Sequence, residues 1–131
     1  MYAQSMLEEI IVLTDDDRPG TLAEIGELLG SAGVNIETLA ASNRIGQGVI
    51  HLVVDDGDDV AEILRSNDYK VDASRPVMAA TLDDKPGEFG RFCRKLSNAG
   101  VDISACYVAR RSGGETELIF AVDDLGAAEQ A

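Results

Sequence analysis

The sequence contains the same segment twice, and this duplication limits the fold more than any other feature. The segment TDDDRPGTLAEIGELLGSAGVNI at 14–36 aligns with TLDDKPGEFGRFCRKLSNAGVDI at 81–103, which matches Asp16 with Asp83 and Asp17 with Asp84. With one extra residue allowed in the intervening loop, VIHLVVDD at 49–56 aligns with ELIFAVDD at 117–124. The repeat is too long to be a solenoid unit. We therefore expect two small domains in tandem, at 1–74 and 75–131.

Each copy predicts the same order of secondary structure. EIIVLT and PVMAATL are short apolar runs that end in acidic turns, which is typical of buried strands. Apolar residues at helical spacing follow in both copies, and Gly33 and Gly100 are expected to end these helices. Two alternating segments joined by a Gly-containing turn then predict a hairpin. Each copy thus begins as strand, helix, strand, strand.

The rest of the first copy completes a ferredoxin-like β-α-β-β-α-β unit of the α+β class. DDVAEILR predicts a short helix capped by Asp58 or Asp59, and YKVDA predicts a fourth strand. The second copy begins its last helix at Asp123 or Asp124 and lacks a fourth strand, so we expect a partner chain or the N-terminal segment to cover the open edge. The linker, about residues 74–76, is short, so the copies should pack as one unit.

Charge and composition exclude several classes of protein. The net charge is -13, from 24 acidic and 11 basic residues, which disfavours binding to nucleic acid or to anionic membranes. The chain has no apolar run of the roughly 18 residues that a membrane span needs, and no targeting segment. Cys93 and Cys106 form no disulfide framework or zinc motif, and we expect both to be reduced, buried and small hydrophobic residues. These features predict a cytoplasmic protein.

The two Pro-Gly junctions are the main candidate binding elements. Pro19 and Pro86 suit the first position of a helix, and Gly20 and Gly87 leave the backbone there open. Unpaired N–H groups at a helix start attract a carboxylate or phosphate, whereas the neighbouring aspartates attract an ammonium group. An amino acid carries both charges. A purely structural role for Pro-Gly is the alternative, although recurrence in both copies favours binding.

A second polar position also recurs at the start of the following strand. Asn35 in the first copy matches Asp102 in the second, and strand alternation places each on the face opposite its apolar neighbours. Each side chain is therefore available for a ligand. The alternative is a turn residue that bonds its own backbone.

The pattern D-x-P-G followed by A-G-V-N/D-I, present twice, resembles two copies of the ACT domain, a small-molecule-binding regulatory module. The resemblance covers the chain from about residue 8. It implies a ferredoxin-like sheet with two helices on one face, pairing with another such domain to bind amino acids at the interface. There the ligand lies between the first strand-helix loop of one domain and the second strand of its neighbour.

The resemblance transfers to specific positions of this chain. The implied ligand-binding residues are Asp17, Arg18, Pro19, Gly20, Thr21, Leu22, Asn35 and Ile36 in the first copy, and Asp84, Lys85, Pro86, Gly87, Glu88, Phe89, Asp102 and Ile103 in the second. The second copy departs from the usual pattern at Asp102, where Asn is commoner, and at Phe89, which is bulkier than Leu22. We therefore expect the first copy to hold ligand and the second to be structural.

The sequence lacks the chemical groups that other functions of this fold require. The sequence shows no nucleophile with a base, no paired acids in a cleft and no metal cluster, and the single His51 lies at a strand position suited to a half-buried or interface role. The acidic runs 15–17 and 55–59 lack the ligand spacing of a calcium loop. RNA binding would need aromatic residues on the central strands, and an acylphosphatase-like site would need a basic first loop, where only Arg18 and Lys85 are cationic.

Together these observations predict a non-catalytic, cytoplasmic regulatory protein without cofactor or metal. It would bind an amino acid between paired domains, form a homodimer, and act on itself or on an enzyme partner. Ligand would favour the paired state by binding it more tightly. The alternative is a structural oligomerisation or docking module that binds no ligand.

Overall fold

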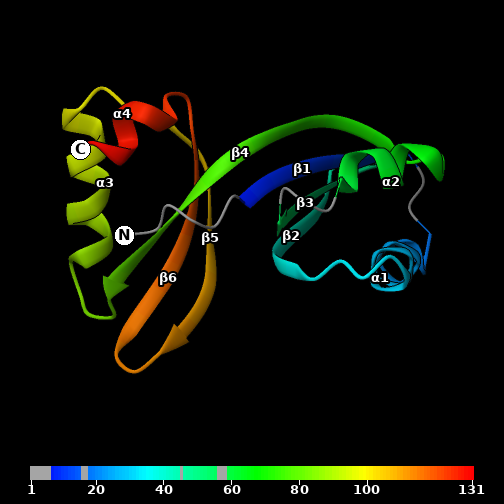
Figure 1. Ribbon diagram of the computed structural model, residues 1–131, viewed down its shortest axis with the longest axis horizontal. Coiled ribbons are helices and arrows are strands. Elements are labelled where there is room, and N and C mark those ends of the chain that lie inside the picture. The colour runs from blue at the N-terminus through cyan, green and yellow to red at the C-terminus, as the bar shows by residue number, and fades with distance from the viewer. Residues whose placement is uncertain (1–6, 16–17, 45, 56–58) are drawn as a thin grey trace. The chain divides into compact units, whose positions relative to one another are not determined.

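A computed structural model describes residues 7–15, 18–44, 46–55 and 59–131 (Figure 1). Its first elements are β1 (Leu7–Thr14), α1 (Thr21–Ser31), β2 (Ile36–Arg44), β3 (Gln47–Asp55) and α2 (Val60–Ser66). The chain continues with β4 (Lys70–Asp83), α3 (Glu88–Asn98), β5 (Ile103–Ser112), β6 (Glu115–Val122) and α4 (Leu125–Glu129). The order strand, helix, strand, strand, helix therefore occurs twice.

The chain divides into two compact units, one ending at Arg75 and the other beginning at Pro76. The first unit has the strand order β2-β3-β1-β4 of a ferredoxin-like β-α-β-β-α-β fold. The second has the order β4-β6-β5, and the part of it that the structure describes contains no further strand after β6. Within each unit the hairpin strands pair antiparallel. The predicted α+β class and the two repeats, the second without its last strand, are confirmed.

Strand β4 takes the place of the predicted linker. The sequence predicts a separate connection at 74–76, and this prediction is wrong, because β4 runs without interruption over 14 residues from Lys70 to Asp83. Pro76 is compatible with the strand because its fixed backbone angle lies within the extended region, although it donates no ladder hydrogen bond. The last strand of the first unit and the first strand of the second are therefore one strand.

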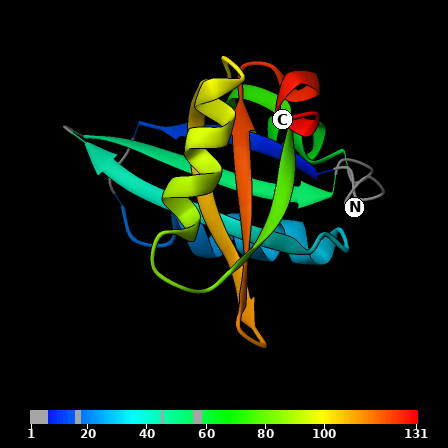
Figure 2. The ribbon, with the colours of Figure 1, turned by 90° about the vertical axis from the view of Figure 1, so that its left-hand side faces the viewer.

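In each unit, one sheet face packs against two helices. Alternate residues of β1 and β3 point toward α1 and α2, as the period of two in a strand requires. In the second unit α3 and α4 cover the strands in the same way (Figure 2). The buried residues of the first core are Ile10, Val12, Ile25, Leu29, Val34, Ile50, Leu52, Val54, Val60 and Leu64. Those of the second are Met78, Ala80, Leu96, Val101, Leu118, Phe120, Val122 and Ala128.

The second core is organised around one aromatic side chain. Phe120 is fully buried, and its ring centroid lies 5.1 Å from that of Phe92 and 6.4 Å from that of Phe89. In the first unit the corresponding position of β3 holds Leu52, because Leu52 pairs with Ile10 where Phe120 pairs with Met78. Aromatic contacts around Phe120 thus replace aliphatic packing in the second unit.

Helices α1 and α3 end in the same hydrogen-bonded turn, which explains the repeated Ala-Gly-Val sequence. The glycines, Gly33 and Gly100, both have φ of +78°, which a residue with a side chain rarely adopts. The following valines donate from their N–H groups to Leu29 and Leu96, at 2.9 and 3.0 Å. This is the Schellman arrangement, which satisfies carbonyls left over at a helix end. The predicted helix stops are confirmed.

The short helices also begin near the predicted aspartates. The side chain of Asp124 accepts a hydrogen bond from the N–H of Ala127 at 2.9 Å, so it caps α4 as predicted. Asp59 precedes α2 but makes no such bond, because its backbone has a φ of +55°. Asp58 lies outside the described residues. Across the described ranges, no helix is long and apolar enough to cross a membrane.

Candidate functional site

The Pro-Gly junctions adopt the same backbone in both units. Gly20 has φ of +105° and Gly87 has φ of +92°, and each is the residue immediately before its helix. The helices therefore begin at Thr21 and Glu88, and the prediction that proline occupies the first helical position is wrong. Proline lies one residue before the cap, because the positive φ of the glycine cannot belong to a right-handed helix. The repeated glycine is explained by backbone conformation.

The loop before these helices is one residue longer in the first unit. On the strand side, Thr14 pairs with Gly48 as Leu82 pairs with Thr116, a shift of 68 positions. On the helix side, Gly20 corresponds to Gly87, a shift of 67. The extra residue therefore falls between Thr14 and Arg18, within the run of three aspartates. One of those aspartates has no counterpart in the second unit; Asp16 and Asp17 lie outside the described residues.

A pocket of about 320 Å³ lies beside this junction in the first unit. Its wall at the helix start carries Arg18, whose two terminal nitrogens donate to both carboxylate oxygens of Glu24 at 2.8 and 2.9 Å. The hydroxyl of Tyr69 donates to the same carboxylate at 3.2 Å. Arg18 and Tyr69 together hold the pKa of Glu24 below its usual range. The pocket is lined by Thr14, Arg18, Gly20, Thr21, Leu22, Ala41, Ser42, Asn43, Gly48 and Ile50.

Two threonines shape the first pocket. The Oγ1 of Thr14 lies only 2.2 Å from the place where a side chain on Gly48 would begin, so Gly48 leaves room for that hydroxyl. The Oγ1 of Thr21 is buried and has no hydrogen-bond partner within the described part of the chain. The first pocket therefore offers hydroxyl groups beside small side chains.

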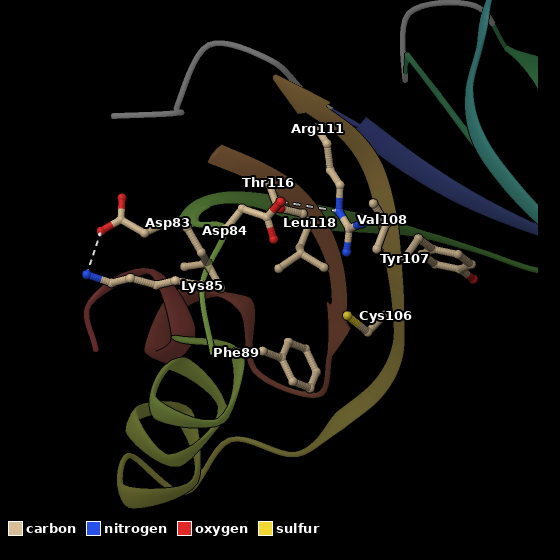
Figure 3. Close-up of a pocket in the computed structure, with 11 residues that line it drawn as sticks. Asp83, Asp84, Lys85, Phe89, Cys106, Tyr107, Val108, Arg111, Thr116 and Leu118 are labelled. Atoms are coloured by element: carbon tan, nitrogen blue, oxygen red, sulfur yellow. Dashed lines mark ion pairs between the residues drawn. The ribbon is translucent and has the colours of Figure 1, made fainter. Parts of the chain in front are cut away.

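The second unit has a pocket of about 360 Å³ at the corresponding place (Figure 3). Its floor is the sheet, and its two sides are the start of α3 and the edge strand β5, where Phe89 and Val108 are about half exposed, at 50% and 51%. The pocket is lined by Leu82, Asp83, Asp84, Lys85, Phe89, Cys106, Tyr107, Val108, Arg111, Thr116 and Leu118. Of these, Figure 3 shows the Tyr107 ring pointing away from the space between Phe89 and Arg111.

Charged groups lie at the rim of the second pocket. The Nε of Arg111 lies 3.8 Å from Oδ2 of Asp84, and the Nζ of Lys85 lies 3.8 Å from Oδ2 of Asp83. Figure 3 shows the Asp83–Lys85 pair directed away from the pocket. The N–H of Asp84 donates to the carbonyl of Gly114 at 2.9 Å, so the loop is attached to the turn between β5 and β6. That attachment keeps Asp84 beside Arg111.

Two further residues of the second pocket, Thr116 and Cys106, were not among the predicted ligand-binding residues. Thr116 is only 7% exposed, and its Oγ1 has no hydrogen-bond partner among the described residues. Cys106 is exposed, so the prediction that both cysteines are buried is wrong for it, whereas Cys93 is partly buried. Desolvation of its thiol against the pocket wall, with the nearby Cys93 thiol adding to the effect, raises the pKa of Cys106 to about 11. Edge-strand position explains the exposure, since β5 is the last strand in the order β4-β6-β5 among the described residues of the second unit.

The remaining predicted positions lie elsewhere in their own units. Asn35 and Asp102 are exposed at the starts of β2 and β5; Asn35 donates from Nδ2 to Glu37 at 3.2 Å, and the N–H of Asp102 donates to Asp123 at 2.9 Å. The pocket lies at the opposite end of the sheet, about 20–25 Å away for seven residues of strand. Within one unit, the loop and these strand positions are therefore not brought together.

Only some of the predicted ligand-binding residues line the two pockets. The structure brings Arg18, Gly20, Thr21 and Leu22 to the first pocket and Asp84, Lys85 and Phe89 to the second. Pro19, Ile36, Pro86, Gly87, Glu88 and Ile103 do not line either one. Sequence reasoning missed the hairpin ends, above all Arg111, Thr116 and Gly48. The available signal was antiparallel geometry, which returns the hairpin turn to the end of the first strand.

Metal binding finds no support among the residues that the structure describes. They contain no group of three or more His, Cys, Asp or Glu side chains that could hold an ion. Instead, the Nδ1 of His51 lies 3.2 Å from Oε2 of the fully buried Glu9. The Nε of Arg75 donates to the same carboxylate at 2.7 Å. The half-buried position of His51 agrees with the prediction from its strand.

Comparisons with known proteins agree with the repeated fold described above. A family model described as an ACT domain pair matches residues 6–131. No curated protein sequence matches significantly. Among solved structures, protein BT0572 from Bacteroides thetaiotaomicron has a TM-score of 0.82 at 18% identity, covering 96% of this chain and 85% of its own. The ligand-free regulatory subunit of aspartate kinase from Thermus thermophilus has a TM-score of 0.73 at 14% identity, covering 97% and 91%.

Proposed function

The chain belongs to the ACT domain pair family, and from this premise we propose that it is a regulatory protein that binds an amino acid and thereby changes its association with itself or with an enzyme. The observation that carries the proposal is the repeated pocket. Both units place a pocket of 320–360 Å³ at the junction of first strand, first helix and hairpin. That size is within the range for small-molecule sites.

The groups around the two pockets suit a zwitterion. Each pocket joins an apolar side chain at the helix start, Leu22 or Phe89, with cationic groups on the loop or hairpin. Asp84 adds an acidic group at the second pocket. A carboxylate would be held by a guanidinium or ammonium group, and an ammonium by a carboxylate. An amino acid matches this combination better than a simple anion does.

The strand positions would contact a ligand only when two chains pair. Asn35 and Ile36, with Asp102 and Ile103, lie too far from the loop of their own unit to share a ligand with it. In a homodimer, one chain could present its strand positions to the loop residues of another, as the resemblance implies. Asp17 to Leu22 and Asp84 to Phe89 would supply the loop half of such a site.

An enzyme partner and a cytoplasmic location complete the proposal. The regulatory subunits of aspartate kinase share this fold, and by their names they are regulatory parts of an enzyme. By analogy this chain would regulate an enzyme without performing catalysis. The free thiols of Cys93 and Cys106 suit a reducing compartment.

A thermal-shift screen against the twenty amino acids tests the proposal, followed by sedimentation velocity with and without each amino acid that stabilises the chain. We expect at least one to raise the melting temperature, since a ligand that binds only the folded state stabilises it by mass action. We also expect that ligand to change the sedimentation coefficient. If none of them stabilises the protein and its mass is unchanged by all, the structural docking module is the correct reading.

A further inference from the structure

Resting on the proposed function, we infer that the pocket of the second unit binds an amino acid with an apolar side chain. Asp84 and Arg111 bind the ammonium and carboxylate groups, Thr116 bonds one of these polar ends, and the side chain lies between Phe89 and Val108. The specificity of the chain therefore comes from its second copy, against the expectation that the first copy holds the ligand.

Thr116 indicates a polar group of the ligand. Its side chain is more than nine-tenths buried, and Oγ1 lacks a hydrogen-bond partner in the described structure, although it lines the pocket. A buried hydroxyl without a partner is unfavourable, and most such groups in folded proteins are satisfied. A ligand atom in the pocket would supply the missing bond. The corresponding position in the first unit is Gly48, which has no such group. The unpartnered hydroxyl of the first pocket belongs to Thr21, which is only partly buried.

The apolar walls indicate the ligand's side chain. Phe89 and Val108 are large and about half exposed, and they lie on opposite sides of the same pocket, on α3 and on β5. The Phe89 ring stacks on the fully buried Phe120, with an interplanar angle of 14°, so its position is fixed. Leu118 lies on the floor between these walls (Figure 3). An aliphatic or aromatic side chain would bury all three surfaces.

A ligand can replace the ion pair at the rim of the second pocket. At 3.8 Å, the Arg111–Asp84 pair is longer than a hydrogen bond, and both side chains are well exposed. Such a pair contributes little by itself. An amino acid could therefore enter between them, its carboxylate bonding the guanidinium of Arg111 and its ammonium bonding Asp84. Figure 3 shows this pair at one end of the pocket and Phe89 with Cys106 at the other, so both ends of the ligand are matched.

The first pocket lacks this combination. Both terminal nitrogens of Arg18 are bonded to Glu24, at 2.8 and 2.9 Å. The wall on the edge strand is Ala41, where the second unit has Val108. A ligand there would meet less apolar surface and an arginine that is already engaged.

Isothermal titration of the full chain tests the inference, with L-leucine, L-valine, L-phenylalanine, glycine and L-aspartate as probes. We expect binding of the apolar amino acids and at least tenfold weaker binding of glycine and aspartate. Thr116→Val keeps the shape and removes the hydroxyl, and should weaken binding about tenfold. Phe89→Ala should weaken it by at least tenfold. N-acetyl-L-leucine, which lacks the ammonium group, should also bind at least tenfold more weakly.

The first unit supplies matched controls. Leu39→Ala removes an apolar side chain of β2 that is 45% exposed and lines neither pocket, and it should leave binding within about twofold. Thr21→Val and Leu22→Ala make the same changes beside the other pocket, so they tell the two pockets apart. If these two variants lose binding while Thr116→Val and Phe89→Ala keep it, the site assignment is overturned and the proposed function stands. A polar amino acid that binds best overturns the assigned ligand class. Absence of heat with all five probes overturns the inference; the proposed function then depends on the wider screen. Because Thr116→Val keeps the shape of the side chain, it still tests the site if Phe89→Ala does not fold.

Discussion

In the first unit the end of the sheet pairs Thr14 with Gly48, whereas in the second it pairs Leu82 with Thr116. Each pair has one threonine, but on opposite strands. In the first unit the hydroxyl lies across the open backbone of Gly48, and in the second it is buried without a partner at the pocket. The second pocket also has Val108 on its edge strand where the first has Ala41, so it forms an apolar slot, whereas the first pocket has small walls beside the unpartnered hydroxyl of the only partly buried Thr21.

The two units also differ in how they build their cores, and this difference should give the largest effects. Phe120 holds Phe89 and Phe92 in place, so Phe120→Ala should lower the free energy of unfolding by about 3–5 kcal/mol, as buried Phe→Ala changes do. The counterpart Leu52→Ala should cost about 2–5 kcal/mol. Denaturation in urea measures both. In addition, Phe120→Ala should abolish ligand binding and Leu52→Ala should not; equal effects on binding would contradict the comparison.

The glycine caps should respond alike in both units. Gly20→Ala and Gly87→Ala place a side chain at a φ near +100°, and each should destabilise the protein by about 1–2 kcal/mol. Gly26→Ala is the control, because Gly26 lies inside α1 with nothing near its added side chain, and it should stabilise by about 0.5–1 kcal/mol. Chemical denaturation checks all three. A cap substitution without effect would show that glycine is kept there for ligand approach alone.

The thiol at the second pocket should react slowly. With the pKa of Cys106 raised from 9.0 to about 11, its thiolate at pH 8 is about 100-fold rarer than that of an ordinary cysteine, and alkylation by iodoacetamide should slow accordingly. Mass spectrometry follows the reaction, with the denatured chain as control. The folded state keeps a proton that the unfolded chain loses above pH 9, so stability should fall from pH 9 to 11. Cys106→Ser should remove this fall, and alkylation at the denatured rate would contradict the assignment.

The smallest effect concerns the rim of the first pocket. Arg18 lowers the pKa of Glu24, so this pair contributes stability above the ordinary carboxyl pKa of 4.5 and loses it as the pH falls through the lowered value. Arg18→Ala should move the pKa of Glu24 back toward its usual range, which an NMR titration of its carboxyl carbon would show. The difference in melting temperature between wild type and variant should shrink as the pH falls through the lowered pKa of Glu24. An unchanged Glu24 titration would mean that Tyr69 controls it.

Much of the fold could be predicted because the duplication shows every pattern twice. Alternating residues such as Ile10 and Val12, and the Ala-Gly-Val helix ends, have local physical causes that the sequence displays directly. The missing linker could not be predicted, because residues 74–76 have turn-like composition and become strand only through pairing with neighbouring strands. Pairing of this kind depends on residues distant in sequence.

The candidate site was predicted only in part for the same reason. The loop residues Arg18, Lys85 and Phe89 belong to a visible motif, and their place at a pocket follows from it. Thr116 and Arg111 belong to no motif, and they reach the pocket because the hairpin folds back along the first strand. The preference for the first copy rested on two departures in the second, Asp102 and the bulkier Phe89. The structure shows the Phe89 ring stacked on Phe120 as one wall of the second pocket.

The most direct test of the difference between the pockets is an NMR titration of the ¹⁵N-labelled chain with L-leucine. The second-unit site predicts saturable shifts of backbone amides at 82–89, 106–111 and 116–118. Amides around the first pocket, at 18–22, 41–43 and 48–50, should stay unchanged at the same ligand concentrations. Saturable shifts confined to the first set of positions around Gly20 and Gly48, or no shifts at any concentration, would contradict the assignment of the second unit as the ligand site.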